Sequence, residues 1–439
     1  MLSKEENQLV TQVEPGTPGG QLLRSYWQPA ALSEEIPPGG PPIPLRLFGE
    51  DLVLFRDEQG RIGLLDLHCS HRCTDLSYGR IEDGGLRCVY HGWLYDVNGK
   101  CLETPAEPPG SRLHEYVRHQ AYPCQEKGGI VFAYMGAGDP PLLPNYEVLS
   151  VPPDRRFVTK HYLACNYLQA QEGSNDGTHV RFLHRFLRTE AGSRQLAEHP
   201  KALAPGEDMG FRDAPAAGSK ALGPVRVEEN DFSVWTYTGM GTGGPEYTFP
   251  SLTLTGGGPQ AGGDGYQIYW TVPIDDTHTW FFVLAFKRSG PIPEEHRHAR
   301  SWALMTPDYH FIRNQSNRYL QDREEQKTAT FTGMGPTFIV QDSMANETQG
   351  PIQNRARETL GTADMSIAAW RQMLLRAIRT VQEGGEPPGR ILDPRVNEVD
   401  PIFLKRNAPP NDDELESILA ETGGRWVKSF GQAVAVKTS

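Results

Sequence analysis

Two short Cys/His pairs constrain this chain more than any other feature of its sequence. Cys69-x-His71 is followed, after sixteen residues, by Cys88-x-x-His91. The alternating order of thiolate and imidazole suits a Rieske [2Fe–2S] cluster, in which two Cys bind one iron and two His bind the other. Structural zinc is the weaker alternative, because Cys2His2 zinc sites usually pair the two Cys first and the two His second. The motif therefore predicts an iron–sulfur cluster.

The length and composition of the chain favour two domains and a cytoplasmic location. A chain of 439 residues with 38% hydrophobic content can bury two sizeable cores. The net charge of −12 argues against nucleic acid or an anionic membrane as a partner. No apolar run reaches the length of a membrane span, and the charged N-terminal segment lacks the apolar core of a signal peptide.

The first part of the chain divides into a helical segment and a β domain. We expect residues 1–40 to be helical, with Ser3 as an N-cap and Glu6 three residues later, ending in the Pro/Gly-rich tract at 37–44. Residues 41–150 then carry the cluster motif. Strand-like runs at 45–57, 61–67, 86–104 and 130–136 predict an antiparallel β domain there.

A Pro-rich segment around residue 150 marks the start of a second domain, residues 151–439. Long strands are expected at 266–276 and 278–288, and residues 204–265 are Gly-rich and expected to be rich in loops. A helix is expected at 363–385, and its apolar residues at helical spacing predict a packing face made of Ile367, Trp370, Leu374 and Ile378.

A second group of polar residues follows residue 170: Glu172, Asp176, His179 and His184. Two His and one carboxylate with open coordination positions form the facial triad of non-haem Fe(II) oxygenases. Five positions correspond to about 140° around an ideal helix, so both His can reach one metal only if the helix is distorted or ends between them. Taken alone the His pair is a weak signal, since a structural His is commoner.

Together, the cluster motif and the run Glu-x3-Asp-x2-His-x4-His resemble the Rieske non-haem iron aromatic-ring-hydroxylating oxygenases. The similarity is to the large (alpha) subunits of the phthalate 4,5-dioxygenase-like branch and runs along nearly the whole chain. It implies an α+β fold, in which an antiparallel β Rieske domain precedes a helix-grip-like catalytic domain, an antiparallel sheet with packed helices.

The resemblance also implies roles for individual residues. His179, His184 and Asp342 would bind a mononuclear iron, with Glu347 as a fallback; the structural alternative for Asp342 is a helix N-cap. Asp176 would bridge electron transfer by hydrogen bonding to His91 of a neighbouring subunit, unless it is a solvent-facing carboxylate. Glu172 would support the iron site or, equally, be a solvated or salt-bridged residue.

The function implied is that of a terminal oxygenase component. It would use O2 and electrons to hydroxylate, dihydroxylate or O-demethylate a small aromatic substrate, an aromatic acid or ether. The chain carries no convincing nucleotide-binding fingerprint, so a separate NAD(P)H-dependent reductase with flavin and a ferredoxin-type centre is expected. The resemblance implies a homotrimer or a stacked hexamer.

Two alternatives belong to other classes: a Rieske electron-transfer protein with an attached small-molecule binding module, and a zinc-stabilised binding protein. If the substrate is an acid, cationic side chains would hold its carboxylate, although a surface position is the commoner role of each candidate. The candidates are Arg188, Arg194, Arg212 and Arg226.

Overall fold

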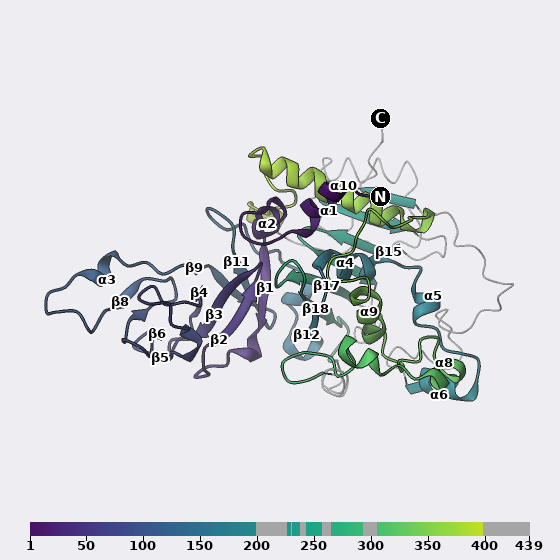
Figure 1. The fold of residues 1–439 in the computed structure, drawn as a ribbon, viewed down its shortest axis with the longest axis horizontal. Coiled ribbons are helices and arrows are strands. Elements are labelled where there is room, and N and C mark those ends of the chain that lie inside the picture. The colour runs from purple at the N-terminus through teal and green to yellow at the C-terminus, as the bar shows by residue number, and fades with distance from the viewer. Residues whose placement is uncertain (199–225, 230, 238–242, 257–264, 293–304, 398–439) are drawn as a thin grey trace.

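The computed structural model describes residues 1–198, 226–229, 231–237, 243–256, 265–292 and 305–397. Small sheets from the N-terminal third of the chain lie at one end of the elongated molecule, and a larger sheet covered by helices lies at the other (Figure 1). Within the described residues, no helix is both long and apolar enough to cross a membrane.

The N-terminal segment is helical only in part. Helix α1 (Lys4–Thr11) begins with the expected capping box: Glu6 N–H donates to Ser3 Oγ (3.1 Å), and Ser3 N–H donates to Glu6 Oε2 (2.9 Å). After α2 (Pro18–Arg24), residues Trp27–Leu32 form strand β1, so the prediction of a helical segment up to residue 40 is wrong there. Pro29 cannot continue a helix, and all six residues of β1 are buried against other strands.

Three antiparallel sheets form the part that carries the cluster motif, as the strand patterns predict. One sheet pairs β1 with β11 and β10, and the other two have the orders β2-β3-β4-β9 and β5-β6-β7-β8. The bounds are β2 (Ile43–Leu47), β3 (Glu50–Arg56), β4 (Ile62–Asp66), β5 (Arg80–Glu82), β6 (Gly85–Arg87), β7 (Leu94–Tyr95), β8 (Cys101–Glu103), α3 (Leu113–Tyr116), β9 (Ala121–Tyr122), β10 (Cys124–Lys127) and β11 (Ile130–Tyr134).

The second part is built on one antiparallel sheet, with the strand order β12-β18-β17-β16-β15-β14-β13 among the described residues. The expected long strands are β17 (Tyr266–Pro273) and β18 (Thr279–Phe286). The loop-rich expectation for 204–265 is wrong for the described stretches, because Val, Tyr and Trp residues between the glycines pair as strands. The remaining bounds are β12 (Arg156–Leu163), β13 (Arg226–Glu229), β14 (Ser233–Tyr237), β15 (Gly243–Thr248) and β16 (Leu252–Gly256).

Helices α4 and α10 pack beside this sheet (Figure 1). The packing face of α10 (Met365–Gln382) is as predicted: Trp370, Leu374 and Ile378 are buried, and Ile367 is half-buried against the same core. The other helices are α4 (Tyr167–Asn175), α5 (Val180–Leu183), α6 (Glu190–Glu198), α8 (Arg323–Thr328) and α9 (Phe338–Glu347). Short 3-10 helices cover Ser33–Glu35, Leu76–Tyr78, Glu147–Leu149, Pro153–Arg155, Gln315–Leu320, Thr362–Asp364 and Pro394–Val396.

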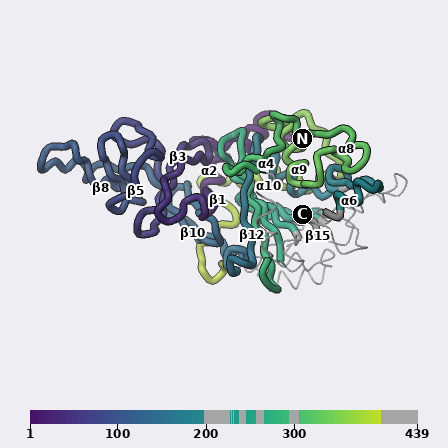
Figure 2. The backbone as a smooth tube through the Cα atoms, turned by 90° about the horizontal axis from the view of Figure 1, so that it is seen from below, coloured from purple at the N-terminus to yellow at the C-terminus, as the bar shows by residue number. Residues whose placement is uncertain are grey.

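The chain has a large core that crosses from β1 and β11 into the seven-stranded sheet, and a smaller one under the cluster motif. Polar contacts join the same elements: Trp270 Nε1 donates to Gln28 Oε1 (3.2 Å), and Lys160 Nζ lies 2.7 Å from a Glu35 carboxylate oxygen. The end that carries β5 and β8 projects away from this junction (Figure 2). The cluster motif therefore sits on a protruding part of the molecule.

Candidate functional site

The two Cys/His pairs lie on two loops closed by backbone hydrogen bonds. In the first, Cys69 N–H donates to Thr74 O and Cys73 N–H donates to Cys69 O (both 2.9 Å). In the second, Cys88 N–H donates to Trp93 O (2.8 Å) and Gly92 N–H donates to Cys88 O (3.0 Å). The two loops thus have the same construction, and each begins with its cysteine.

The four side chains separate into a buried pair and a surface pair. The thiols of Cys69 and Cys88 are buried, whereas His71 and His91 are partly or fully exposed, with ring centroids 4.4 Å apart. A [2Fe–2S] cluster with one thiolate-bound and one imidazole-bound iron fits this division. A single tetrahedral zinc ion would give no reason for such a division of the four ligands.

Tyr95 is a functional candidate that the sequence reasoning missed. Its hydroxyl lies 3.2 Å from Cys69 Sγ, and its ring stacks on His119 with a centroid separation of 4.6 Å. A metal-bound thiolate has no proton, so the hydroxyl would donate. The position of Tyr95 four residues after His91 was the available signal, but its contact with Cys69 depends on how the two loops pack.

The second candidate centre is formed by the side chains of His179, His184 and Asp342, which converge in the structure. His184 Nε2 lies 3.1 Å and His179 Nε2 lies 3.5 Å from Asp342 Oδ1. The three donor atoms lie within 4.8 Å of one another, and this is the one such group of His, Cys, Asp or Glu in the described ranges. His184 is buried, with 3% of its side chain exposed, and Asp342 is 37% exposed. Two imidazoles and one carboxylate on one side of a metal leave other positions open, as oxygen chemistry requires.

The local backbone explains how two His five positions apart converge. Helix α4 ends at Asn175, and α5 is a single turn, with His179 immediately before it and His184 immediately after it. The expected end of the helix between the two His is therefore present. Their ring centroids lie 5.0 Å apart.

Asp342 lies inside α9, whose N-cap is Thr337. The N-cap alternative for Asp342 is therefore wrong. The fallback residue, Glu347, points elsewhere: it accepts hydrogen bonds from Ala164 N–H (3.0 Å) and from the Tyr319 hydroxyl.

Asp176 contacts one of the two imidazoles. Its Oδ2 lies 3.6 Å from His179 Nδ1, while Oδ1 accepts from Thr178 N–H (2.7 Å) and Oγ1 (2.6 Å). Burial opposes ionisation of Asp176, but the contacts with His179 and Thr178 outweigh it and lower the pKa of the carboxyl to about 2. The same contact and the charge of Asp342 raise the pKa of His179 despite its burial. Asp176 is thus an ionised neighbour of the site, and its bridge to another subunit stays a prediction.

Glu172 does not face the group of donors. Its carboxylate is buried between Arg355 (2.9 Å) and Arg371 (2.6 Å), and Arg371 also pairs with Glu358. Burial would raise the pKa of Glu172, but the two guanidinium charges outweigh this effect and lower it. Of the roles considered for Glu172, the structure shows the salt bridge, which ties α4 to α10.

The arginines considered for a substrate carboxylate find no support. Arg188 and Arg194 are exposed, and Arg194 pairs with Glu190 at 3.3 Å. Arg212 and the side chain of Arg226 lie outside the described residues.

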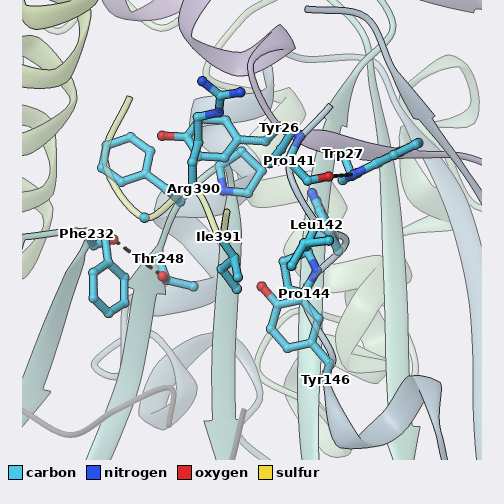
Figure 3. A pocket seen from close by; sticks show the side chains of 14 residues that line it. Tyr26, Trp27, Pro141, Leu142, Pro144, Tyr146, Phe232, Thr248, Arg390 and Ile391 are labelled. Carbon is cyan, nitrogen blue, oxygen red and sulfur yellow. Dashed lines mark hydrogen bonds between the residues drawn. The ribbon is translucent and has the colours of Figure 1, made fainter. Parts of the chain in front are cut away.

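A pocket with about 400 Å³ of empty volume lies elsewhere (Figure 3). Thr248 and Trp270 line it from the sheet, and none of the candidate ligands does. Thr248 follows Tyr247, whose hydroxyl donates to Glu172 O on α4, so strand alternation places the pocket on the opposite face of the sheet. It is separate from the group of donors.

Comparison with known protein families identifies two domains in the chain. Residues 26–123 match the Rieske [2Fe-2S] domain, and residues 263–401 match a domain described as LigXa C-terminal domain like. The Rieske match begins at β1, earlier than the expected boundary at residue 41.

Several relatives extend over most of the chain, and two of them are oxygenase subunits that act on phthalate and on dehydrodivanillate by their names. The phthalate 4,5-dioxygenase oxygenase subunit of Pseudomonas putida is 35% identical, covering 88% of each chain. The 5,5'-dehydrodivanillate O-demethylase oxygenase subunit of a Sphingobium species is 32% identical, covering 98% of this chain and 94% of the relative.

The fold also matches a solved structure, the terminal oxygenase of carbazole 1,9a-dioxygenase from a Novosphingobium species. The TM-score is 0.56 at 21% identity, with 86% of this chain and 99% of that chain covered. The fold, the motifs and the full-length relatives together show that the chain belongs to the Rieske non-haem iron aromatic-ring-hydroxylating oxygenases, as an oxygenase (alpha) subunit of the phthalate 4,5-dioxygenase-like branch.

Proposed function

We propose that Cys69, His71, Cys88 and His91 hold the Rieske cluster, and that His179, His184 and Asp342 hold the mononuclear iron. The observation that carries the proposal is the convergence of the last three donors within 4.8 Å. When bound, the iron activates O2 and the cluster supplies electrons. The chain's own residues fix where each step can occur.

The exposed imidazoles give the cluster site an accessible edge. His71 stacks on Trp93 with ring centroids 4.6 Å apart, and Tyr90 lies over His91 at 3.8 Å. We therefore expect electrons to enter and leave through the imidazole side, because the thiol side is buried.

In a homotrimer or stacked hexamer, Asp176 would accept a hydrogen bond from His91 of the neighbouring subunit. Its low pKa supports this role, because an ionised carboxylate can accept from imidazoles on both sides. Asp176 would then connect the cluster edge of one subunit to His179 of the next.

The substrate class we propose is a small aromatic acid or ether, which the chain would hydroxylate, dihydroxylate or O-demethylate. Support comes from the substrates in the names of the two full-length relatives. The charge of Asp342 acts on the buried His161, whose ring centroid lies 4.8 Å from that of Phe281 and 4.7 Å from that of Phe311. These buried rings offer a largely apolar wall.

A separate NAD(P)H-dependent reductase would supply the electrons. All six cysteines are free thiols, as a cytoplasmic location allows. We propose that the cluster domain ends, and the catalytic domain begins, at about residue 150. Residues 1–40 form an N-terminal segment that contributes β1 to a sheet of the cluster domain.

Metal analysis tests the site assignment against an electron carrier. Wild-type protein should contain about three irons and two acid-labile sulfides per chain, the sum of a [2Fe–2S] cluster and one mononuclear iron. His179→Ala should lose one iron and all turnover and keep the Rieske EPR signal. His310→Ala is the matched control, because His310 is a partly exposed imidazole outside the group. Two irons in the wild type, unchanged after Fe(II) reconstitution, would favour the carrier.

Substrate screening tests the second half of the proposal. NADH oxidation and O2 uptake with a matched reductase should be stimulated by benzoate-type acids or methoxylated aromatics, with one oxidised product per turnover. Stimulation by non-aromatic alcohols alone would contradict the proposed class.

A further inference from the structure

The ring of His184 is held on three sides. Nε2 faces Asp342 Oδ1 at 3.1 Å, and Nδ1 lies 2.7 Å from Gln341 Oε1. One face of the ring stacks on Phe338, with centroids 4.1 Å apart and planes 7° from parallel. Phe338, Gln341 and Asp342 all belong to the first turns of α9, where residues three and four apart share a face.

The amide of Gln341 can be oriented in only one way. Its Nε2 donates to Gly335 O at 2.7 Å, and a backbone carbonyl can only accept. The amide oxygen must therefore face His184, because the reversed amide would place two oxygens against each other. An amide oxygen accepts only, so His184 Nδ1 carries the proton, and the neutral imidazole of this tautomer presents the lone pair of Nε2 on the side of Asp342.

The carbonyl that anchors Gln341 is itself fixed. Gly335 has φ +74°, a conformation that favours glycine, and its N–H donates to Glu325 Oε1 at 2.7 Å. The same carboxylate oxygen accepts from the Thr330 hydroxyl at 2.8 Å. A chain of hydrogen bonds thus runs from Glu325 through Gly335 and Gln341 to the ring of His184.

The other imidazole is held differently. His179 is 22% exposed, and its partner Asp176 is a carboxylate 3.6 Å away. His184 is 3% exposed, and its partner is a neutral amide 2.7 Å away. The neutral amide of Gln341 adds no charge to the site, and its shorter contact holds the ring of His184 more tightly than Asp176 holds that of His179.

We infer that Gln341 is a positioning residue that fixes the Nδ1–H tautomer and the ring orientation of His184 for metal binding. The inference rests on the proposed iron site. Gln341 touches neither a substrate nor the metal; it acts through His184, as hydrogen-bond partners of metal-binding His generally do, and their loss typically weakens metal affinity about 10–100-fold.

The test is an anaerobic titration of mononuclear-iron-free protein, with its cluster intact, using Fe(II), and Co(II) as an optical probe. Gln341→Leu removes both hydrogen bonds and should weaken binding of both ions by about 10–100-fold. Gln341→Glu keeps an acceptor for His184 Nδ1–H, and its second oxygen keeps the contact with Gly335 O when it carries a proton. This variant should therefore bind both ions more tightly than Gln341→Leu and show the wild-type Co(II) spectrum. If the Leu variant does not fold, Gln341→Asn carries the same test, because its shorter side chain cannot reach both partners.

Gln169→Leu is the matched control. Gln169 is another buried amide that donates to backbone carbonyls, those of Asn346 (3.1 Å) and Gly350 (2.9 Å), and it lies outside the group of donors. Its replacement should lower the melting temperature and leave metal affinity unchanged. Gln341→Leu with affinity within twofold of wild type, or an equal loss of affinity in Gln169→Leu, would overturn the inference. A wild-type protein that binds neither ion here would instead refute the iron site itself.

Discussion

Glu246 makes the stability of the fold depend on pH. This carboxyl is fully buried on β15, between Trp235 and Leu254 on the neighbouring strands, and among the described residues neither oxygen has a hydrogen-bond partner of normal geometry. Burial raises its pKa from the usual 4.5 to about 8, and the nearby Ser233 offsets only part of that effect. Tyr146, a neighbour whose pKa is raised well above its usual value, stays neutral in the same range.

The direction of the pH dependence follows from the number of protons that the folded and unfolded states bind. Because the folded-state pKa lies above the unfolded one, the folded state binds more protons between pH 4.5 and about 8, and stability falls as pH rises through that window. For one group shifted in this way, the loss between about pH 6 and about pH 8.5 is on the order of 2–3 kcal/mol. Glu246→Gln keeps the shape and removes the titration, so the variant should lack this loss.

The assay is urea denaturation of wild type and Glu246→Gln at a series of pH values, followed by Trp fluorescence. Trp235 pairs directly with Glu246 across the strands, so its emission reports on this part of the sheet. The difference in stability between the two proteins should grow in favour of the variant as pH rises. A difference that stays constant from pH 6 to pH 8.5 would show that the carboxyl is paired or hydrated in the folded state, and the reasoning would fail.

Three further predictions concern the two centres and the buried salt bridge of Glu172. Tyr95→Phe removes the hydrogen-bond donor to Cys69 and should lower the reduction potential of the cluster by roughly 30–100 mV in an EPR-monitored titration. A hydrogen bond to a charged group is worth about 1.5–3 kcal/mol, and only part of this energy differs between the two oxidation states. An unchanged potential would show that the hydroxyl does not donate. Arg355→Met leaves Glu172 paired with Arg371 alone, and it should lower the free energy of unfolding by about 3–5 kcal/mol in thermal unfolding without changing the cluster spectrum. A loss below about 1 kcal/mol would mean that Arg371 alone is enough to stabilise the buried carboxylate. Asp176→Asn should retain both metals and slow single turnover, and an unchanged rate would rule out its bridging role.

Features that depend on the spacing of nearby residues can be predicted well from the sequence. Features that depend on contacts between distant segments cannot. The Cys/His order, the capping box at Ser3 and the end of α5 just before His184 all follow from short-range patterns. The strand at 27–32 was missed because its pairing with β11 joins segments about a hundred positions apart. Gln341 was missed for the same reason: a lone Gln beside Asp342 has no distinctive pattern until α9 packs next to α5.

The group of donors also joins distant parts of the chain. His184 and Gln341, the residue before Asp342, are 157 positions apart, with the strands β13 to β18 in between. The four cluster residues, by contrast, lie within Cys69–His91. At a synthesis rate of about 5–20 residues per second, roughly 8–30 s separate the emergence of the two imidazoles from that of the carboxylate. During translation the cluster loops are therefore complete well before the mononuclear site, so the four cluster ligands become available to a metal first.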